Sequence, residues 1–540
     1  MQRRALAATV IFIAGAAALG ATLGAYGAAS DEPNYLHAAD LEVRWASQWL
    51  GTGQVDGRSA FDPEVLHRYW DSNPLRIPHP PLSRELSAVA ATLAPAGVRP
   101  LVAHRLHLAV LGGLMLVVAF LWLDEWLGRP SAWAGVVALI AMPQLVGHAH
   151  VGLTDFPLAF FWLAALAAAA ATRIAPLRRG ALTGLLVGCA LATKLPGAFL
   201  AVVIAGWILW VRRTGGLREL VVVAVVAAVV AIALNPNGWV DPVEKLRTWL
   251  RLSTTRKDFH AIRSFYFGKT YAFHPPWHYP WVQLFATTPL GLFGLAVAGL
   301  TSGLRGTGLD RDNTLLAGAG ALILPAVLTW PGSPCHDGVR LFLPTLPLVA
   351  VLAVRGHAAI VAWLGARARH GGATDAEAIR RKLAWAVGAV GLGPGLIATV
   401  LTHPYSMAYY GAGVGGVRGA DRLGLETTYL KEVMTPGFIA ALDRSIPPHS
   451  VVLTGFTYEE LAFDQETGDL DPSFRLSDFP PADFLVMVHR KSELSEFGWK
   501  VRREVTPVYE VKLDGVPLAS LYRVAREEPP ASVDGASPGG

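Results

Sequence analysis

Acidic residues lie at the ends of apolar runs at two places in the sequence. Asp31 and Glu32 directly follow the uncharged run 5–29, and Asp155 stands at the start of another apolar run. A carboxylate can take the proton of a hydroxyl group that acts as a nucleophile. We therefore predict Asp31 as a general base supported by Glu32, with Asp155 as a second acidic member. The alternative is that these residues only start helices, since a proline follows two residues after Asp31 and Asp155.

Basic side chains occupy comparable positions. Lys194 lies between two apolar runs, Arg340 comes just before another, and Arg84 lies in a segment interrupted by prolines. Lysine can serve as a point charge for a phosphate group, and arginine can bind phosphate with two parallel hydrogen bonds. These residues are candidate contacts for a phosphorylated lipid. The alternative for Lys194 is that its ammonium group simply extends towards the membrane surface.

Histidines complete this set of candidate substrate contacts. His79 precedes two prolines, His148 lies close to the predicted acidic site, and His336 is followed by Asp337. For His79 the alternative is a rigid turn without a binding role. His148 and His150 form an H-x-H pair, which leaves a divalent cation open, because imidazole and carboxylate ligands suit several metals.

The composition indicates a membrane protein with many spans. The chain has 540 residues, of which 52% are hydrophobic and 16% are charged, whereas soluble domains carry about 25% charged residues. The net charge is +5, but the basic residues stand between apolar runs. They are therefore interpreted as topology signals, and no nucleic-acid partner is expected.

The apolar runs predict about eleven transmembrane helices in a domain that covers residues 1–402. We place them at residues 5–29, 100–123, 131–147, 155–172, 179–195, 196–213, 217–235, 283–303, 313–331, 338–366 and 382–402. The two longer connections, 30–99 and 236–282, are rich in Trp and Tyr. Such side chains favour the membrane–water interface, so interfacial helices are expected in both connections.

The distribution of Lys and Arg predicts the orientation of these helices. Basic residues concentrate in the connections that share a side with the N-terminus, including Arg129 and Arg178. The positive-inside rule then places the N-terminus in the cytoplasm and the candidate site residues outside it. The first run could instead be a cleaved signal peptide, although it is longer than the usual apolar core of one. Asp31 would be extracytoplasmic in both cases.

The remainder of the chain is less apolar and predicts a small extracytoplasmic α/β domain over residues 403–526. Residues 450–454 and 483–488 resemble buried strands, and two further strands flank the hairpin signal Asp514-Gly515. The tail 527–540 is rich in Pro, Gly and Ser and is expected to be disordered.

Short motifs make the chain resemble glycosyltransferase family 39 of the GT-C superfamily, which includes protein O-mannosyltransferases and lipid A aminoarabinose transferases. The matching segments are Asp31-Glu32, His79-Pro80-Pro81-Leu82, His148 with Thr154-Asp155-Phe156-Pro157-Leu158-Ala159, Ala192-Thr193-Lys194, Asp337-Gly338-Val339-Arg340, His403-Pro404-Tyr405, Tyr409-Tyr410 and Gly415-Gly416. These segments occur in the same order as in the family and are spread over nearly all of residues 1–430. The aminoarabinose transferases place a lysine in the region of His79-Pro80-Pro81, so this segment is closer to that of the O-mannosyltransferases.

This resemblance implies a GT-C fold and a polyprenyl- or dolichyl-phosphate-linked sugar as donor. The sugar would be transferred with inversion to an extracytoplasmic acceptor, such as a protein hydroxyl group, a lipid or a cell-envelope glycan. Asp31 matches the catalytic acidic motif of the family, Glu32 matches its neighbour, and Asp155 matches the second acidic position. Lys194 and Arg340 suit the donor phosphate by their chemistry.

Other functional classes remain open at this point. A transporter or lipid flippase would also hold charged residues near its spans, but such proteins often show internal repeats and sites near the membrane midplane. An assembly subunit that binds a partner through its C-terminal domain is a third class. Neither requires acidic residues at the same membrane face. Since no nucleotide-binding glycine motif is present in the sequence, an enzyme that uses a lipid-linked sugar is expected.

Overall fold

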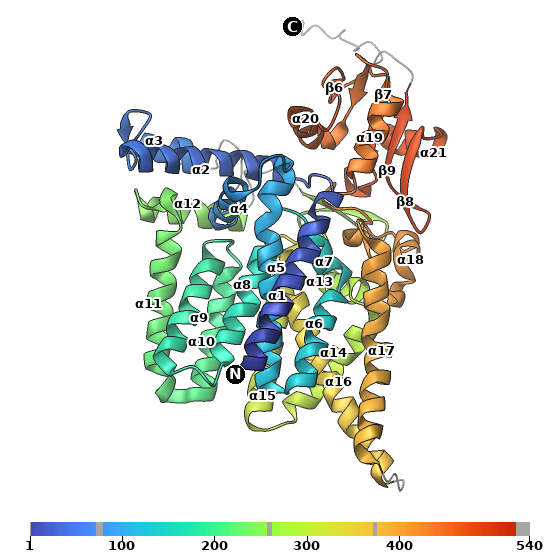
Figure 1. Ribbon diagram of the computed structural model, residues 1–540. Helices are drawn as coiled ribbons and strands as arrows, with labels where there is room; N and C mark the ends of the chain where they lie inside the picture. The colour runs from blue at the N-terminus through green and yellow to red at the C-terminus, as the bar shows by residue number, and fades with distance from the viewer. Residues whose placement is uncertain (1, 72–78, 256–261, 371–374, 525–540) are drawn as a thin grey trace, which may run out of the picture.

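Most of the chain folds into helices that lie side by side in one bundle (Figure 1). The computed structural model describes residues 2–71, 79–255, 262–370 and 375–524. The long helices of the bundle are α1 (Gln2–Thr22), α5 (Pro100–Trp126), α6 (Arg129–Ile140), α8 (Asp155–Ala170), α9 (Pro176–Leu191), α10 (Gly197–Arg212), α11 (Leu217–Ala233), α14 (Leu290–Leu304), α15 (Gly308–Leu328), α16 (Thr345–His370) and α17 (Ala376–Thr402). Each predicted apolar run contains one of these helices.

Two of the predicted spans are broken. The run 131–147 contains α6 and the short helix α7 (Pro143–His148). The run 283–303 contains the end of α13 (Tyr279–Thr287) and α14, and the axes of α13 and α14 are bent by 117° relative to each other. Met142 and Thr288 have extended backbones at these breaks. Each precedes a proline, whose ring disfavours the helical conformation of the residue before it.

Five described helical stretches are long and apolar enough to cross a membrane, and the bent pair α13–α14 would make a sixth. They are Gln2–Ala25, Pro100–Trp126, Gly197–Ala233, Thr345–Arg369 and Glu377–Thr402. The stretch Gly197–Ala233 comprises α10, a short 3₁₀ turn and α11. The number is smaller than eleven because several other predicted runs form helices of only 12 to 16 residues, such as α6 and α8. These stretches support a location in the membrane.

Glycines allow α14 and α16 to pack closely. A Cβ atom on Gly299 of α14 would overlap the carbonyl oxygen of Leu352, and one on Gly356 of α16 would overlap that of Leu295. Small residues at such a crossing let two helix backbones approach each other, which is the usual way for helices to associate in membranes.

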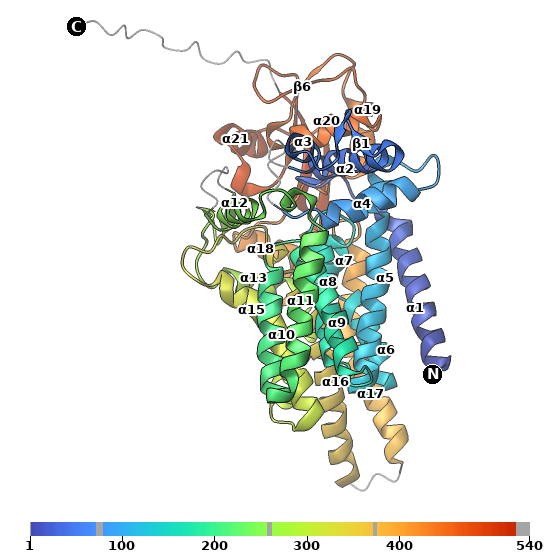
Figure 2. The ribbon, with the colours of Figure 1, turned by 90° about the vertical axis from the view of Figure 1, so that its left-hand side faces the viewer.

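Helices also lie across one end of the bundle (Figure 2). They are α2 (Glu32–Thr52), α3 (Pro63–Trp70), α4 (Leu82–Leu93) and α12 (Pro242–Thr255), with the hairpin β1 (Gln54–Val55) and β2 (Arg58–Ser59) between α2 and α3. Trp45 and Trp70 are buried together at the contact of α2 and α3. This arrangement agrees with the interfacial helices that were predicted in both long connections.

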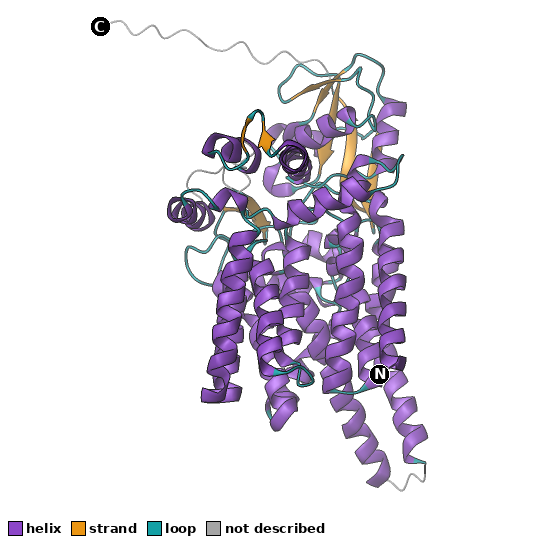
Figure 3. Ribbon diagram, turned by 60° about the vertical axis from the view of Figure 1, so that its left-hand side comes forward, coloured by secondary structure: helices purple, strands orange, loops and turns teal. Residues whose placement is uncertain are grey.

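The C-terminal part contains a five-stranded sheet at the same end of the bundle as α2 (Figure 3). The strand order is β6 (Arg475–Ser477), β5 (Val451–Leu453), β7 (Phe484–Val488), β9 (Val516–Arg523) and β8 (Tyr509–Leu513). The helices around it are α18 (Gly416–Arg422), α19 (Pro436–Ser445), α20 (Tyr458–Glu466) and α21 (Glu496–Glu504). A second hairpin, β3 (Arg263–Tyr266) and β4 (Lys269–Ala272), precedes α13. The small α/β domain is thus confirmed as an element of the fold.

The predicted strands of this domain are all present, and the tight turn is where the sequence places it. Asp514 and Gly515 both have positive φ, at 47° and 77°, which a two-residue hairpin of this type requires. Strand β6, which was not predicted, has only three residues and pairs in parallel with β5. The predicted disordered tail 527–540 lies outside the described residues.

Replacing Gly299 by leucine should force α14 and α16 apart. Overpacking of a close contact typically costs about 1–3 kcal/mol, so the Gly299→Leu variant should unfold at a lower temperature in detergent. Gly294→Leu is the matched control, because a Cβ atom on Gly294 of the same helix meets nothing within 4 Å. Equal unfolding temperatures for the two variants would contradict this account of the packing.

Candidate active site

Arg340 lies at the centre of a cluster of charged side chains at the sheet-bearing end of the bundle. Its Nε donates to Oδ2 of Asp155 at 3.0 Å, and its Nη1 donates to Oδ2 of Asp337 at 3.0 Å. Its Nη2 lies 3.7 Å from Oδ2 of Asp31. These carboxylates come from the start of α8, the connection between α15 and α16, and the residue before α2. The fold therefore brings together three acidic residues that are far apart in the sequence.

Lys194 is the second cation of this cluster. It lies in the turn between α9 and α10, and its Nζ donates to Oδ1 of Asp155 at 2.5 Å. Asp155 is therefore bound by a different cation on each oxygen. Both partners are buried, and such pairing is what makes an ionised group tolerable away from water.

Asp337 is held by cations on both of its carboxylate oxygens. Its Oδ2 accepts from His336 Nδ1 and from Arg340, and its Oδ1 accepts from Arg490 Nη2, each at 3.0 Å. Burial alone would raise the pKa of Asp337, but Arg490, His336 and Arg340 hold that pKa well below its usual range. Asp337 is therefore ionised at neutral pH.

Asp31 differs from the other two carboxylates in its exposure. Its side chain is 58% exposed, against 3% for Asp155 and for Asp337. It stands at the N-cap position of α2, yet its side chain makes no capping hydrogen bond. The interpretation of Asp31 as a simple helix cap therefore does not fit its geometry. Its carboxylate is open to a group that approaches from outside the protein.

Glu32 makes its hydrogen bonds with residues outside this cluster, and its predicted support of Asp31 stays a prediction. Its carboxylate is fully buried and forms two hydrogen bonds with Arg105 of α5, at 2.7 and 2.6 Å. It also accepts hydrogen bonds from the backbone N–H groups of Gly152 and Ala29. All four contacts are made by groups of the protein, so Glu32 acts on the site as a positioning residue.

The guanidinium group of Arg105 also binds the backbone that leads from α1 to α2. It donates to the carbonyl oxygens of Leu23, Tyr26 and Gly27 at 2.7 to 3.1 Å. The Glu32–Arg105 pair thus fixes the connection that carries Asp31. Through Gly152, it also fixes the loop that leads to Asp155.

Arg84 is paired with a residue outside this cluster. The Nε of Arg84 donates to Oε1 of Glu42 at 2.8 Å, and both side chains are buried between α2 and α4. Its Nη1 donates to the carbonyl oxygen of His79 at 3.3 Å. Because its charge is compensated by Glu42, the expectation that Arg84 meets a donor phosphate receives no support from this geometry.

His148 lies near the cluster, whereas His150 does not share its surroundings. Burial lowers the pKa of His148, whose charged neighbours include Asp155 and Arg340. Its Nδ1 donates to the carbonyl of Gln144, while His150 stacks on Tyr26 and makes a hydrogen bond with Thr22. The two histidines are thus engaged separately.

A resident divalent cation does not fit these side chains. Among the residues that the structure describes, no group of three or more His, Cys, Asp or Glu side chains could hold a metal ion. Asp155 and Asp337 are instead paired with lysine and arginine. The divalent cation that the H-x-H pair left open stays a prediction.

Two further residues at the site, Arg490 and Tyr35, were not predicted from the sequence. Arg490 follows β7 within the C-terminal domain, and Tyr35 is buried on α2 among the charges of Asp31 and Arg340. Arg490 could have been suspected from the sequence, because it follows a predicted buried strand, and residues at the carboxyl ends of parallel strands often have functions; β7 is parallel to β5. For Tyr35 the signal was only its position, one helical turn after Asp31.

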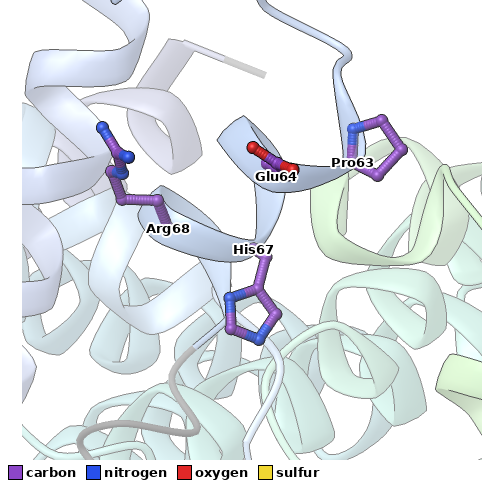
Figure 4. A pocket seen from close by; sticks show the side chains of 4 residues that line it. All are labelled: Pro63, Glu64, His67 and Arg68. Carbon is purple, nitrogen blue, oxygen red and sulfur yellow. The ribbon is translucent and has the colours of Figure 1, made fainter.

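A hollow lies beside α3 (Figure 4). It has a volume of about 550 Å³ and is lined by Pro63, Glu64, His67 and Arg68. None of these residues belongs to the predicted site or to the Arg340 cluster.

Solved structures of two glycosyltransferases are similar to this chain over most of its length. The crystal structure of ArnT from Cupriavidus metallidurans in the apo state has a TM-score of 0.52 at 15% identity, covering 96% of this chain and 98% of that one. ArnT bound to undecaprenyl phosphate has a TM-score of 0.52 at 16% identity, covering 97% and 99%. The Archaeoglobus fulgidus oligosaccharyltransferase tethered with an acceptor peptide containing the NVT sequon has a TM-score of 0.50 at 11% identity, covering 96% and 74%.

These similarities define the class of fold. The chain has the GT-C fold, which confirms at the level of fold the resemblance seen in the short sequence motifs. No protein-family model matches the sequence, and no curated protein matches it. At 11 to 16% identity the solved structures establish the fold alone.

Replacing Glu32 by glutamine should destabilise the protein strongly. The variant keeps the shape of the side chain but leaves the charge of Arg105 uncompensated in a fully buried position, which typically costs about 3–5 kcal/mol. The unfolding temperature of the purified protein in detergent should therefore fall. Glu64→Gln is the control, because Glu64 forms an exposed pair with Arg58. An unchanged unfolding temperature for Glu32→Gln would contradict the positioning role.

Proposed function

We propose that the protein is an integral-membrane glycosyltransferase that moves a sugar from a polyprenyl-phosphate donor to an extracytoplasmic acceptor, with Asp31 as the general base. The observation that supports this proposal is that one cluster contains both an exposed carboxylate and a buried guanidinium group. An exposed carboxylate, Asp31, lies 3.7 Å from the buried guanidinium of Arg340. A proton acceptor and a phosphate-binding cation are therefore neighbours at a surface that substrates can reach.

The donor phosphate is bound at the side of Arg340 that faces Asp31. There the contact of 3.7 Å is longer than the two contacts of 3.0 Å to Asp155 and Asp337. Phosphate oxygens compete best for the least engaged donor, and guanidinium groups bind phosphate well. The similarity to ArnT bound to undecaprenyl phosphate supports a lipid phosphate as the carrier. Lys194 adds a second positive charge, which is bound to the other oxygen of Asp155.

Transfer proceeds as a direct displacement at the anomeric carbon. Asp31 takes the proton of the acceptor hydroxyl group while its oxygen forms the new bond to that carbon. The bond between the anomeric carbon and the phosphate oxygen breaks, and the electron pair leaves with the lipid phosphate. Arg340 and Lys194 compensate the charge of the leaving group. Attack from the side opposite to the phosphate inverts the configuration, in line with the family resemblance.

The site faces the outside of the cell, and the N-terminus faces the cytoplasm. The ends of α5, α8 and α10 lie at the end of the bundle that carries the N-terminus (Figure 1), and Arg129, Arg178 and Arg213 follow these ends closely in the chain. The positive-inside rule assigns that end to the cytoplasm. The Arg340 cluster lies at the opposite end, with the C-terminal sheet. In this assignment residues 1–402 form the transferase domain and residues 403–526 an extracytoplasmic domain, and the acceptor is a protein hydroxyl group, a lipid or a cell-envelope glycan.

Replacing Asp31 by asparagine should abolish transfer without unfolding the protein. A positioned general base typically contributes about 10²- to 10⁴-fold to a rate, so the variant should lose at least about a hundredfold in kcat. Purified protein is supplied with a panel of polyprenyl-phosphate sugars and acceptors, and the products are identified by mass.

The matched control is Asp40→Asn on the same helix. Asp40 is 60% exposed and lies 3.5 Å from His104, outside the Arg340 cluster. This variant should transfer sugar at the wild-type rate. Full activity of Asp31→Asn beside an active wild type would rule out Asp31 as the base.

A further inference from the structure

Arg490 connects the C-terminal domain to the Arg340 cluster. We propose that it is a positioning residue through which this domain sets the positive charge that Arg340 offers to the donor phosphate. The proposal rests on the function proposed above and adds the C-terminal domain to the donor site.

The contacts of Arg490 join three separate segments. Its Nη2 donates to Oδ1 of Asp337 at 3.0 Å and to the carbonyl oxygen of Arg263 in β3 at 3.1 Å. Its Nη1 donates to the carbonyl oxygen of Tyr429 at 2.6 Å. Arg490 is 6% exposed, so it spans the boundary between the sheet and the bundle as a buried charge.

The segment after β7 holds Arg490 in this position. The backbone N–H groups of Lys491 and Ser492 donate to the carboxylate of Glu426 at 2.6 and 3.0 Å, and Lys491 Nζ donates to the carbonyl of Leu425 at 2.9 Å. Because the residues that follow Arg490 are anchored, its side chain has little freedom to leave Asp337.

The same domain also contacts the helix that begins after Asp31. Asn34 of α2 donates to Glu459 of α20 at 3.0 Å, and His37 lies 3.2 Å from Glu466. The C-terminal domain therefore touches both the helix next to the proposed base and the loop next to Arg340.

The effect of Arg490 on the donor site is electrostatic. Asp337 has one oxygen on Arg490 and the other on Arg340 and His336. Without Arg490, the full negative charge of Asp337 would be compensated by Arg340 and His336. Arg340 would then have less positive charge to offer to a phosphate, since interactions between buried charges are poorly screened.

The test measures the binding of undecaprenyl phosphate, which does not depend on turnover. Arg490→Gln should weaken binding to the full-length protein by about tenfold, as expected for one unpaired buried charge at the site. Arg490→Lys keeps the charge and should lose less. Arg475→Gln is the control, since Arg475 is an exposed arginine of β6 in the same domain.

A second substitution separates electrostatic from purely structural effects. In Arg490→Gln/Asp337→Asn the surplus negative charge is removed together with Arg490, so binding should return to within about threefold of the wild type. If Arg490→Gln binds as the wild type does, or if the double variant binds no better than the single one, the proposal is wrong. If the wild type itself neither binds undecaprenyl phosphate nor transfers any sugar of the panel, the proposed function fails instead.

Discussion

The buried ion pair of Glu32 and Arg105 is the constraint on which the candidate site depends. Both side chains are fully buried, and their hydrogen bonds reach the α1–α2 connection, α5 and the loop before α8. A charge in this position is tolerable only with a complete set of partners. The surrounding backbone therefore has little freedom, and the position of Asp31 at the start of α2 follows from it.

The buried charges of the Arg340 cluster are also paired, but one of its carboxylates, Asp31, is exposed. Asp155 and Asp337 are both buried, and each is bound by a cation on both of its oxygens: Asp155 by Lys194 and Arg340, and Asp337 by Arg340 and Arg490. Asp31 shares Arg340 with them but remains open to the outside. The buried, ionised carboxylates of Asp155 and Asp337 hold cations in place, whereas the exposed carboxylate of Asp31 can exchange a proton with a substrate. The chemistry we propose assigns these two roles to different members of the same cluster.

Much of the architecture could be predicted because its signals are local. Each apolar run contains a helix of the bundle, although two runs are broken, and the strands around Asp514-Gly515 form the expected hairpin. The breaks at Pro143 and Pro289 were missed because the apolar runs continue through them. Among the candidate site residues, Asp31, Asp155, Lys194, Asp337 and Arg340 come together, and His336 is bonded to one of them. The role of Arg84 stays a prediction, and the sequence does not reveal that Glu42 compensates its charge.

The sequence by itself determined the helical membrane architecture, the α/β character of the C-terminal part and the short list of ionisable residues near helix ends. Hydropathy, turn residues and residue type act over a few neighbouring positions, so these features can be read locally. Only the tertiary structure decided which charge pairs with which. Glu32 and Arg105 are 73 positions apart, Asp155 and Arg340 are 185 apart, and Asp337 and Arg490 are 153 apart. Burial forces each of these charges to find a partner, and the fold selects that partner by bringing distant segments together.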